Sequence, residues 1–131
     1  MEVNAYWYNA LRILQKLAPT AGGDGDAYGA LAEQVKTSFI NAFWMEEEGY
    51  LKDVISGTGA DRQLRCNQIW AVTMPFTMLS PAQERRIVEN VRCFLYTPFG
   101  LRTLSPEDPE FHPLYEGSQQ ERDMACHQGT I

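Results

Sequence analysis

Residues 3–17 read VNAYWYNALRILQKL, and their apolar side chains follow the period of an α-helix. The apolar positions recur at alternating steps of four and three residues: Val3, Trp7, Ala10, Leu14 and Leu17. Pro19 ends this run, because a proline cannot continue a regular helix. The pattern predicts a first helix that ends near Leu17.

A second run with the same period follows a small, polar connection. Asp24 or Asp26 can cap its first turn, because a short acidic side chain accepts hydrogen bonds from free backbone N–H groups. The apolar positions are Tyr28, Leu31, Val35, Phe39 and Ala42. We therefore expect a second helix to about Trp44. The apolar and β-branched residues from Tyr50 to Ile55 then predict one short strand.

Two further helices are predicted between residues 67 and 98. Residues 67–79 leave almost no polar face, which is typical of a buried helix, and Pro75 should kink it or end its regular part. Ser80-Pro81-Ala82-Gln83 forms a capping box with proline at the first helical position. The helix after it should turn Ile87, Val88, Val91, Phe94 and Leu95 inward.

Composition restricts the classes of partner. Seventeen acidic and eleven basic residues give a formal charge of −6, which repels nucleic acids and anionic membranes. There is no uncharged run near the roughly 18 residues of a membrane span and no secretory leader at Met1. The three cysteines have no CxxC spacing, so we interpret them as reduced thiols in a cytoplasmic protein.

Polar clusters at residues 2–4, 65–68 and 123–128 each follow a loop. Buried helices alternating with amphipathic ones are typical of a toroid of inner and outer helices. The clusters would then gather at one rim, at the N-terminal ends of the inner helices. Residues 98–131 predict a long proline-rich loop that leads into an inner helix cut short at the end of the chain.

The clusters resemble motifs of bacterial and archaeal glycogen debranching enzymes. Residues 2–11, EVNAYWYNAL, are similar to E-(I/V)-N-A-L-W-Y-N-A-L, and residues 65–72, RCNQIWAV, to R-P-N-Q-(I/F)-x-A-(V/I). Residues 100–106 read GLRTLSP as in the family, and residues 122–130, RDMACHQGT, resemble R-D-x-A-Y-H-Q-G-T. Cys66 and Cys126 depart from the family's usual proline and tyrosine. The resemblance is to the amylo-α-1,6-glucosidase domain and covers nearly the whole chain.

The resemblance implies an all-α fold: part of an (α/α)6 toroid, about four helices in inner and outer pairs plus long loops, as one domain over residues 1–131. It implies hydrolysis of α-1,6 branch linkages in glycogen or limit dextrin, without a cofactor. That chemistry needs a carboxylic acid and a carboxylate base. The resemblance puts the acid before residue 1 and the base after residue 131, so we expect no catalytic residue here and no activity of the chain alone.

The residues expected to line the glucan cleft each have a simpler interpretation. They are Glu2, Asn4, Arg65, Asn67, Gln68, Asp123, His127 and Gln128. Glu2 could be a solvated acid that the helix dipole favours, and Asn4 a cap. Arg65 and its neighbours could cap the buried helix and pair with Asp61 or Asp123.

Asp123 and His127 are four residues apart, so on a helix they share a face. They could be an acid–base pair, two metal ligands or an inert pair, and we favour a hydrogen-bonded pair that faces sugar. A metal is not expected, because His112 is the only other histidine and no third ligand has a suitable spacing.

The aromatic residues fall into two groups. Those on helical faces are expected in the core: Trp7, Phe39, Phe43, Trp70, Phe76 and Phe94. Phe111 and Tyr115 could stack on a pyranose ring or plug an open core. Three functional classes stay open: part of a glucan hydrolase, a glucan-binding module without catalysis, and a helical domain that self-associates through exposed flanks as a homo-oligomer.

Overall fold

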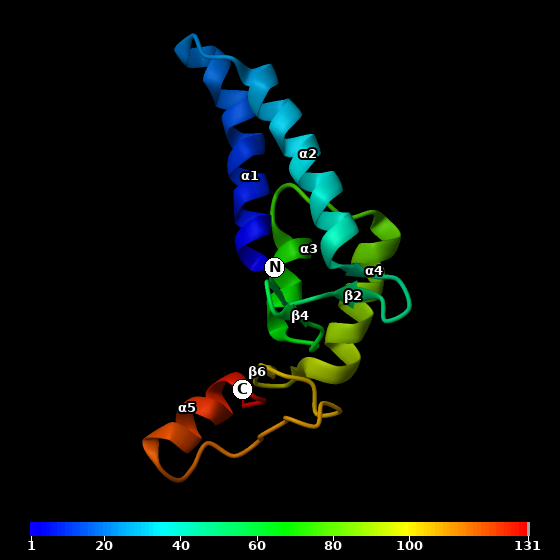
Figure 1. Ribbon diagram of the computed structural model, residues 1–131, viewed down its shortest axis with the longest axis vertical. Helices are drawn as coiled ribbons and strands as arrows, with labels where there is room; N and C mark the ends of the chain where they lie inside the picture. The colour runs from blue at the N-terminus through cyan, green and yellow to red at the C-terminus, as the bar shows by residue number, and fades with distance from the viewer. Residues whose placement is uncertain (131) are drawn as a thin grey trace.

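The computed structural model describes residues 1–130, and these residues form a mainly helical domain with short hairpins (Figure 1). The α-helices are α1 (Glu2–Leu17), α2 (Gly25–Phe43), α3 (Trp70–Thr73), α4 (Pro81–Asn90) and α5 (Gln119–His127). Two 3-10 turns, Ala18–Ala21 and Cys66–Ile69, and a π turn, Val91–Leu95, extend α1, α3 and α4. The helical class is as predicted, while the toroid stays a prediction.

Three antiparallel hairpins connect the helices in the described part of the chain. They pair β1 (Trp44–Met45) with β2 (Tyr50–Leu51), β3 (Val54–Ser56) with β4 (Gly59–Asp61), and β5 (Tyr96–Thr97) with β6 (Gly100–Leu101). The single strand predicted for residues 50–55 is therefore wrong. Asp53 interrupts it, and the two halves pair with different partners.

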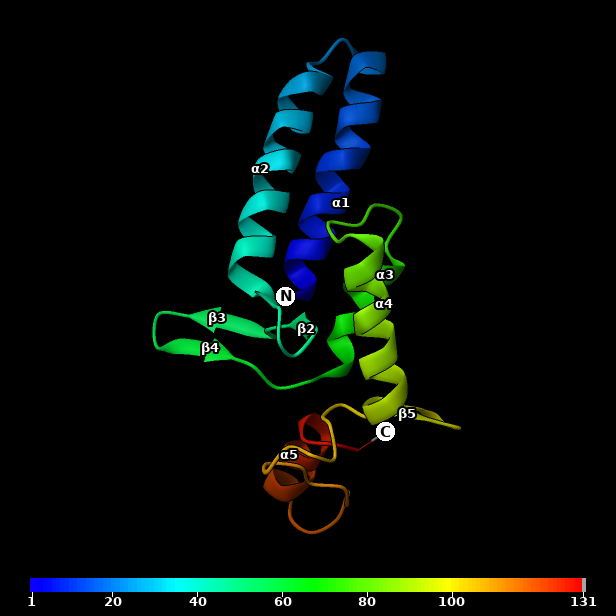
Figure 2. The same ribbon diagram turned by 90° about the vertical axis from the view of Figure 1, so that its right-hand side faces the viewer.

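Helices α1 and α2 form a long antiparallel pair that extends away from the rest of the molecule (Figures 1 and 2). The predicted cap at Asp24 is confirmed, because its carboxylate accepts hydrogen bonds from the amides of Asp26 and Ala27 at 2.9 and 3.1 Å. Gly25 allows the two helices to meet closely. A Cβ there would lie 2.6 Å from the carbonyl oxygen of Gln15.

Helix α1 has two apolar faces, and the buried one is not the stripe that the sequence pattern picked out. Its buried positions are Ala5, Tyr8, Asn9 and Leu11. Trp7, Leu14 and Leu17 of the predicted stripe are exposed, and Val3 is 70% exposed. The expectation of a core position is therefore wrong for Trp7. Helix α2 packs along α1, and its fully buried Ala32 belongs to the same core cluster as Ala5, Tyr8 and Leu11 of α1.

The predicted buried helix over residues 67–79 is much shorter in the structure. Regular helix ends at Thr73, two residues before Pro75, as proline geometry demands. Ala71, Met78 and Leu79 are buried, but Trp70 is 42% exposed, so its predicted core position is also wrong. Trp70 packs beside Tyr6 on the outer surface, with ring centroids 5.7 Å apart. The remaining aromatic predictions are confirmed: Phe39 is buried, and Phe43, Phe76 and Phe94 are partly buried against the core.

Asn9 joins α1 to the extended segment that follows α3. Its amide nitrogen donates to the carbonyl of Phe76 at 2.8 Å, and its amide oxygen accepts from the N–H of Phe76 at 2.9 Å. One side chain thus satisfies two backbone groups that Pro75 leaves outside any helix. This clamp fixes the middle of α1 relative to the segment that follows α3.

Helix α4 begins at the predicted capping box, with Ser80 and Gln83 bonded in both directions. Ile87, Val91 and Leu95 are buried as predicted, whereas Val88 is exposed. The segment after residue 98, predicted as a long loop leading into an inner helix, holds β6 and then α5, and its last residue, Ile131, lies outside the described residues. No helix within residues 1–130 is long and apolar enough to cross a membrane.

Candidate functional site

Arg65 connects two of the predicted polar clusters. Its side chain is largely buried, and the guanidinium donates to the carbonyl of His127, to the amide oxygen of Gln128 at 3.1 Å and to that of Gln63. Residues 65–68 and 127–128 thus meet, but residues 127–128 lie at the C-terminal end of α5 and not at the predicted N-terminal end of a helix. The main chain of Arg65 also forms an isolated β-bridge with Leu104, in the loop that leads to α5.

Two carboxylates lie on the other side of the Arg65 guanidinium. Its Nε is 3.6 Å from Asp61 and 3.8 Å from Asp53, so the predicted ion pair with Asp61 is present. Asp53 is 8% exposed, which is unusual for an acid and requires compensating partners. Asn67 supplies a second one, donating to Asp53 at 3.3 Å. Asp53, through its contacts with Arg65 and Asn67, holds the start of the 3-10 turn over residues 66–69.

The first cluster, at the start of α1, reaches this group through Asp53. The amino group of Met1 donates to the Asp53 carbonyl at 2.6 Å. Burial lowers the pKa of that amino group, and the charges of Asp53 and Glu2 oppose the effect. Within residues 1–130 the side chains of Glu2 and Asn4 make no hydrogen bond, and both are half-buried. They are therefore available to a ligand.

Gln68 is fully buried and pairs with the main chain of β2. Its amide oxygen accepts from Leu51 N–H at 2.9 Å, and its nitrogen donates to the Leu51 carbonyl at 2.7 Å. The side chain acts as a substitute for a neighbouring strand. A direct sugar contact by Gln68 would require one of these bonds to open.

Asp123 and His127 lie on one face of α5, which begins at a capping box formed by Ser118 and Glu121. Asp123 accepts from Gln119 at 2.9 Å, and the described residues show no hydrogen bond between Asp123 and His127. The predicted pair is therefore adjacent in position but not bonded. Both side chains are exposed and border an open hollow on this face of α5.

Cys66 lies between the acids of the cluster. Burial raises the pKa of its thiol, and the charges of Asp53 and Glu2 raise it further, while a backbone hydrogen bond and Arg65 act in the opposite direction. The thiol is consequently protonated at neutral pH. Cys126, the other departure from the family pattern, is exposed on α5.

The two loop aromatics have different settings. Phe111 is half-buried and packs against Gly129, where a Cβ would lie 2.3 Å from the ring, so it helps to hold the end of α5. Tyr115 is 58% exposed. Of the two interpretations given above, Phe111 fits the packing role and Tyr115 keeps a free ring.

Sequence reasoning missed two members of the cluster, Asp53 and Gln63. Gln63 accepts from Arg65 and donates to Asp108 and Glu110 at 3.1 and 2.9 Å, so it links Arg65 to the loop after residue 104. Neither position has a local signal. The position of Asp53 between two hairpins suggests a structural role, but only after both hairpins are known.

Within the described residues, Asp53 and Arg65 thus bond to Met1 beside the first cluster, to Asn67 of the second, and to His127 and Gln128 of the third. A search of individually curated proteins found no significant match. A family model described as amylo-alpha-1,6-glucosidase matches residues 1–131, which is the whole chain. The chain therefore belongs to the amylo-alpha-1,6-glucosidase family.

Proposed function

We propose that the cluster around Arg65 lines the glucan cleft of an enzyme that hydrolyses α-1,6-glucosidic branch linkages in glycogen or limit dextrin. The observation that carries this proposal is the convergence on Arg65 of residues 62 positions apart, through its bonds to the His127 carbonyl and the Gln128 amide oxygen. Convergent polar side chains from separate segments are typical of binding sites.

The polar groups of the cluster suit a neutral polyhydroxylated ligand. Carboxylates accept hydrogen bonds from sugar hydroxyls, and Glu2 and Asp123 have oxygens without a partner in the described residues. Asn4 and His127 can donate or accept. Arg65, Asn67, Gln68 and Gln128 would hold the surrounding backbone, because their bonds already go to the protein.

Hydrolysis itself requires two carboxyl groups about 6.5–9.5 Å apart in an inverting enzyme. The proposal assigns both to elements outside residues 1–131, as the family resemblance implies. This chain would supply binding and orientation, which contribute to rate by holding the branch glucose near the reacting groups.

Glucan binding by this chain is the first test. We expect maltohexaose to bind in isothermal titration calorimetry, and Glu2→Gln or Asp123→Asn to weaken binding roughly tenfold, the value of one hydrogen bond to a charged acceptor. Glu89→Gln, on the exposed face of α4, is the control with the same charge change. Unchanged affinity in both cluster variants would exclude the proposed cleft.

Catalysis is tested separately, by glucose release from phosphorylase limit dextrin. We expect no release by residues 1–131 alone. Release would contradict the assignment of both carboxylates to other elements, and Glu2 and Asp123 would then be the pair to substitute.

Self-association is a second candidate, and the exposed apolar face of α1 favours it. This face carries Val3, Tyr6, Trp7, Leu14 and Leu17, with Trp70 beside it. Such a continuous apolar patch is unusual on a monomer. Sedimentation velocity should show a dimer that Trp7→Ser weakens, while Leu114→Ser, at an exposed loop leucine, should leave it unchanged. A monomer at high concentration would contradict this candidate.

A further inference from the structure

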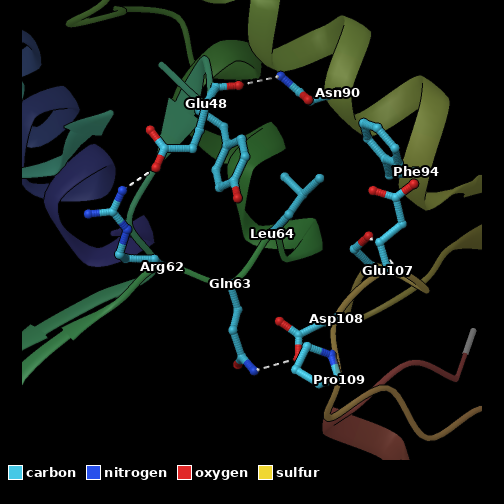
Figure 3. A pocket seen from close by; sticks show the side chains of 11 residues that line it. Glu48, Arg62, Gln63, Leu64, Asn90, Phe94, Glu107, Asp108 and Pro109 are labelled. Atoms are coloured by element: carbon cyan, nitrogen blue, oxygen red, sulfur yellow. Dashed lines mark hydrogen bonds and ion pairs between the residues drawn. The ribbon is translucent and has the colours of Figure 1, made fainter. Parts of the chain in front are cut away.

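A cavity lies next to the cluster around Arg65, between α4 and the loop after residue 104, and Gln63 contributes to both. Its volume is about 510 Å³, within the range of pockets that hold small ligands. Figure 3 shows four segments that meet there: the turn before β2, the residues after β4, the C-terminal part of α4 with its π turn, and residues 105–109.

The walls of this cavity are partly aromatic. Tyr50 from β2 and Phe94 from the π turn are both half-buried and pack against the core, and Leu64 closes the floor. Half-buried rings leave one part in contact with the protein and another free to contact a ligand. Sugar rings have apolar faces that suit such walls.

The polar groups of the cavity are mostly hydrogen-bond acceptors without partners. Within residues 1–130, the carboxylate of Glu107 makes no hydrogen bond or ion pair, and the close-up shows it beside Phe94 (Figure 3). The amide nitrogen of Asn90 shares its two protons among three backbone carbonyls, and its amide oxygen has no partner in the described residues. Asp108 uses one oxygen, Oδ1, for its bonds to Gln63 and to Glu110 N–H, and its other oxygen stays free.

Tyr50 supplies a donor. Burial raises the pKa of its hydroxyl most, the charge of Glu48 raises it further against an opposing effect of Arg62, and Asp108 adds the smallest rise. The hydroxyl therefore keeps its proton over the physiological range. A cavity with several free acceptors and one donor matches a ligand that offers many hydroxyl groups.

The charge of the lining excludes anionic ligands. Three carboxylates, of Glu48, Glu107 and Asp108, face one guanidinium, that of Arg62, which already pairs with Glu48. We propose that this cavity is an accessory binding site for a neutral oligosaccharide, a short segment of the same α-glucan chain. The identity of the sugar rests on the proposed function, whereas the preference for a neutral polyol rests on the cavity alone.

Gln63 forms the partition between the cavity and the first cluster. One end of its amide bonds to Asp108 at the cavity, and the other accepts from Arg65. A glucan held at the cavity therefore lies next to the proposed cleft. Two adjacent sites on a branched polymer raise the effective concentration of each chain at the other site.

The test is a titration of the ¹⁵N-labelled chain with maltohexaose, followed by amide chemical shifts. We expect shifts at residues 48–50, 62–64 and 105–109, and a dissociation constant for these shifts that rises roughly tenfold in Glu107→Gln. Phe94→Leu should also weaken binding, by loss of the ring. Glu89→Gln is the matched control on the same helix and should change nothing.

The two proposals fail independently in this experiment. Shifts confined to residues 2–4, 65–68 and 123–128 would overturn the accessory site and leave the cleft intact, and shifts confined to residues 48–50 and 105–109 would do the reverse; Gln63 belongs to both and does not count for either. Binding at this cavity should be unaffected by 0.5 M NaCl, because the ligand is neutral. Shifts there with spermidine but not with maltohexaose would show a cation site and overturn the proposal.

Discussion

Arg65 donates a hydrogen bond to the main-chain carbonyl of His127, at the last residue of α5. This bond ends a helix and closes a long loop at the same time. A guanidinium satisfies a free helical carbonyl better than water does, because it also offers charge to the negative end of the helix dipole.

Replacing this arginine by lysine should therefore loosen α5. Arg65→Lys keeps the charge but loses the fork that reaches His127, Gln128 and Gln63 together. We expect the free energy of unfolding to fall by about 1–3 kcal/mol. Urea denaturation measures this loss, and hydrogen exchange should show it concentrated in the amides of residues 119–127.

Arg62→Lys is the control for this substitution. Arg62 also pairs with one carboxylate, that of Glu48, but its side chain is 60% exposed. Exposed ion pairs contribute little, so no resolvable change in stability is expected. Equal effects of the two substitutions would show that Arg65 has no special role in holding α5.

Gln68 should tolerate substitution even less well than Arg65. Gln68→Met has nearly the same shape but removes both bonds to Leu51, whose N–H and carbonyl then lie buried without partners. The expected loss is about 2–4 kcal/mol, from two unsatisfied backbone groups. Gln119→Met, on exposed α5, serves as the control in the same denaturation experiment. A loss below about 0.5 kcal/mol would mean that the β1–β2 hairpin does not depend on this amide.

The elements that could be predicted are those with complete local signals. The cap at Asp24 and the box at Ser80 and Gln83 were sufficient to place α2 and α4. Helix α5 has an equivalent signal in Ser118 and Glu121, but the prolines before it favour a loop and hide its start. Local hydrogen bonds of this kind are readable from sequence because both partners are three residues apart.

The features that could not be predicted depend on contacts between distant segments. The sequence of α1 offers two apolar faces, and only α2 decides that Leu11, not Leu14, is buried. Gln68 looked like a ligand-binding polar residue, because nothing nearby shows that Leu51 needs its amide. Polar residues in a motif can thus conceal structural roles.

Cys66 should be the slowest of the three thiols to react. Its pKa is raised by burial and by the charges of Asp53 and Glu2, so less thiolate is present at any pH, and each unit of pKa lowers that fraction about tenfold. In a variant that retains only Cys66, modification by Ellman's reagent at pH 8 should be slow. Glu2→Gln removes one of the negative charges that oppose ionisation of the thiol and should speed the modification, whereas Glu89→Gln should not. Faster reaction of Cys66 than of exposed Cys93 would contradict the burial and the raised pKa of the Cys66 thiol.

The two capping boxes should respond differently to acid, because only one can titrate. In α5 the carboxylate of Glu121 accepts from Ser118 N–H, which lowers its pKa below the ordinary 4.5, while in α4 the same place is taken by the neutral amide of Gln83. A carboxyl group with a lowered folded pKa stabilises the fold fully above its unfolded value, and that contribution is lost as the pH falls through the folded pKa. The amide resonance of Ser118 should therefore move in a titration from pH 7 to 2.5 with a midpoint below 4.5, while that of Ser80 stays in place. Glu121→Gln reproduces the α4 box and should abolish the movement. A midpoint at or above 4.5 would show that the cap does not form in solution. Without the hydrogen bond from Ser118, the Glu121 carboxylate would lose the main cause that lowers its pKa below the ordinary value.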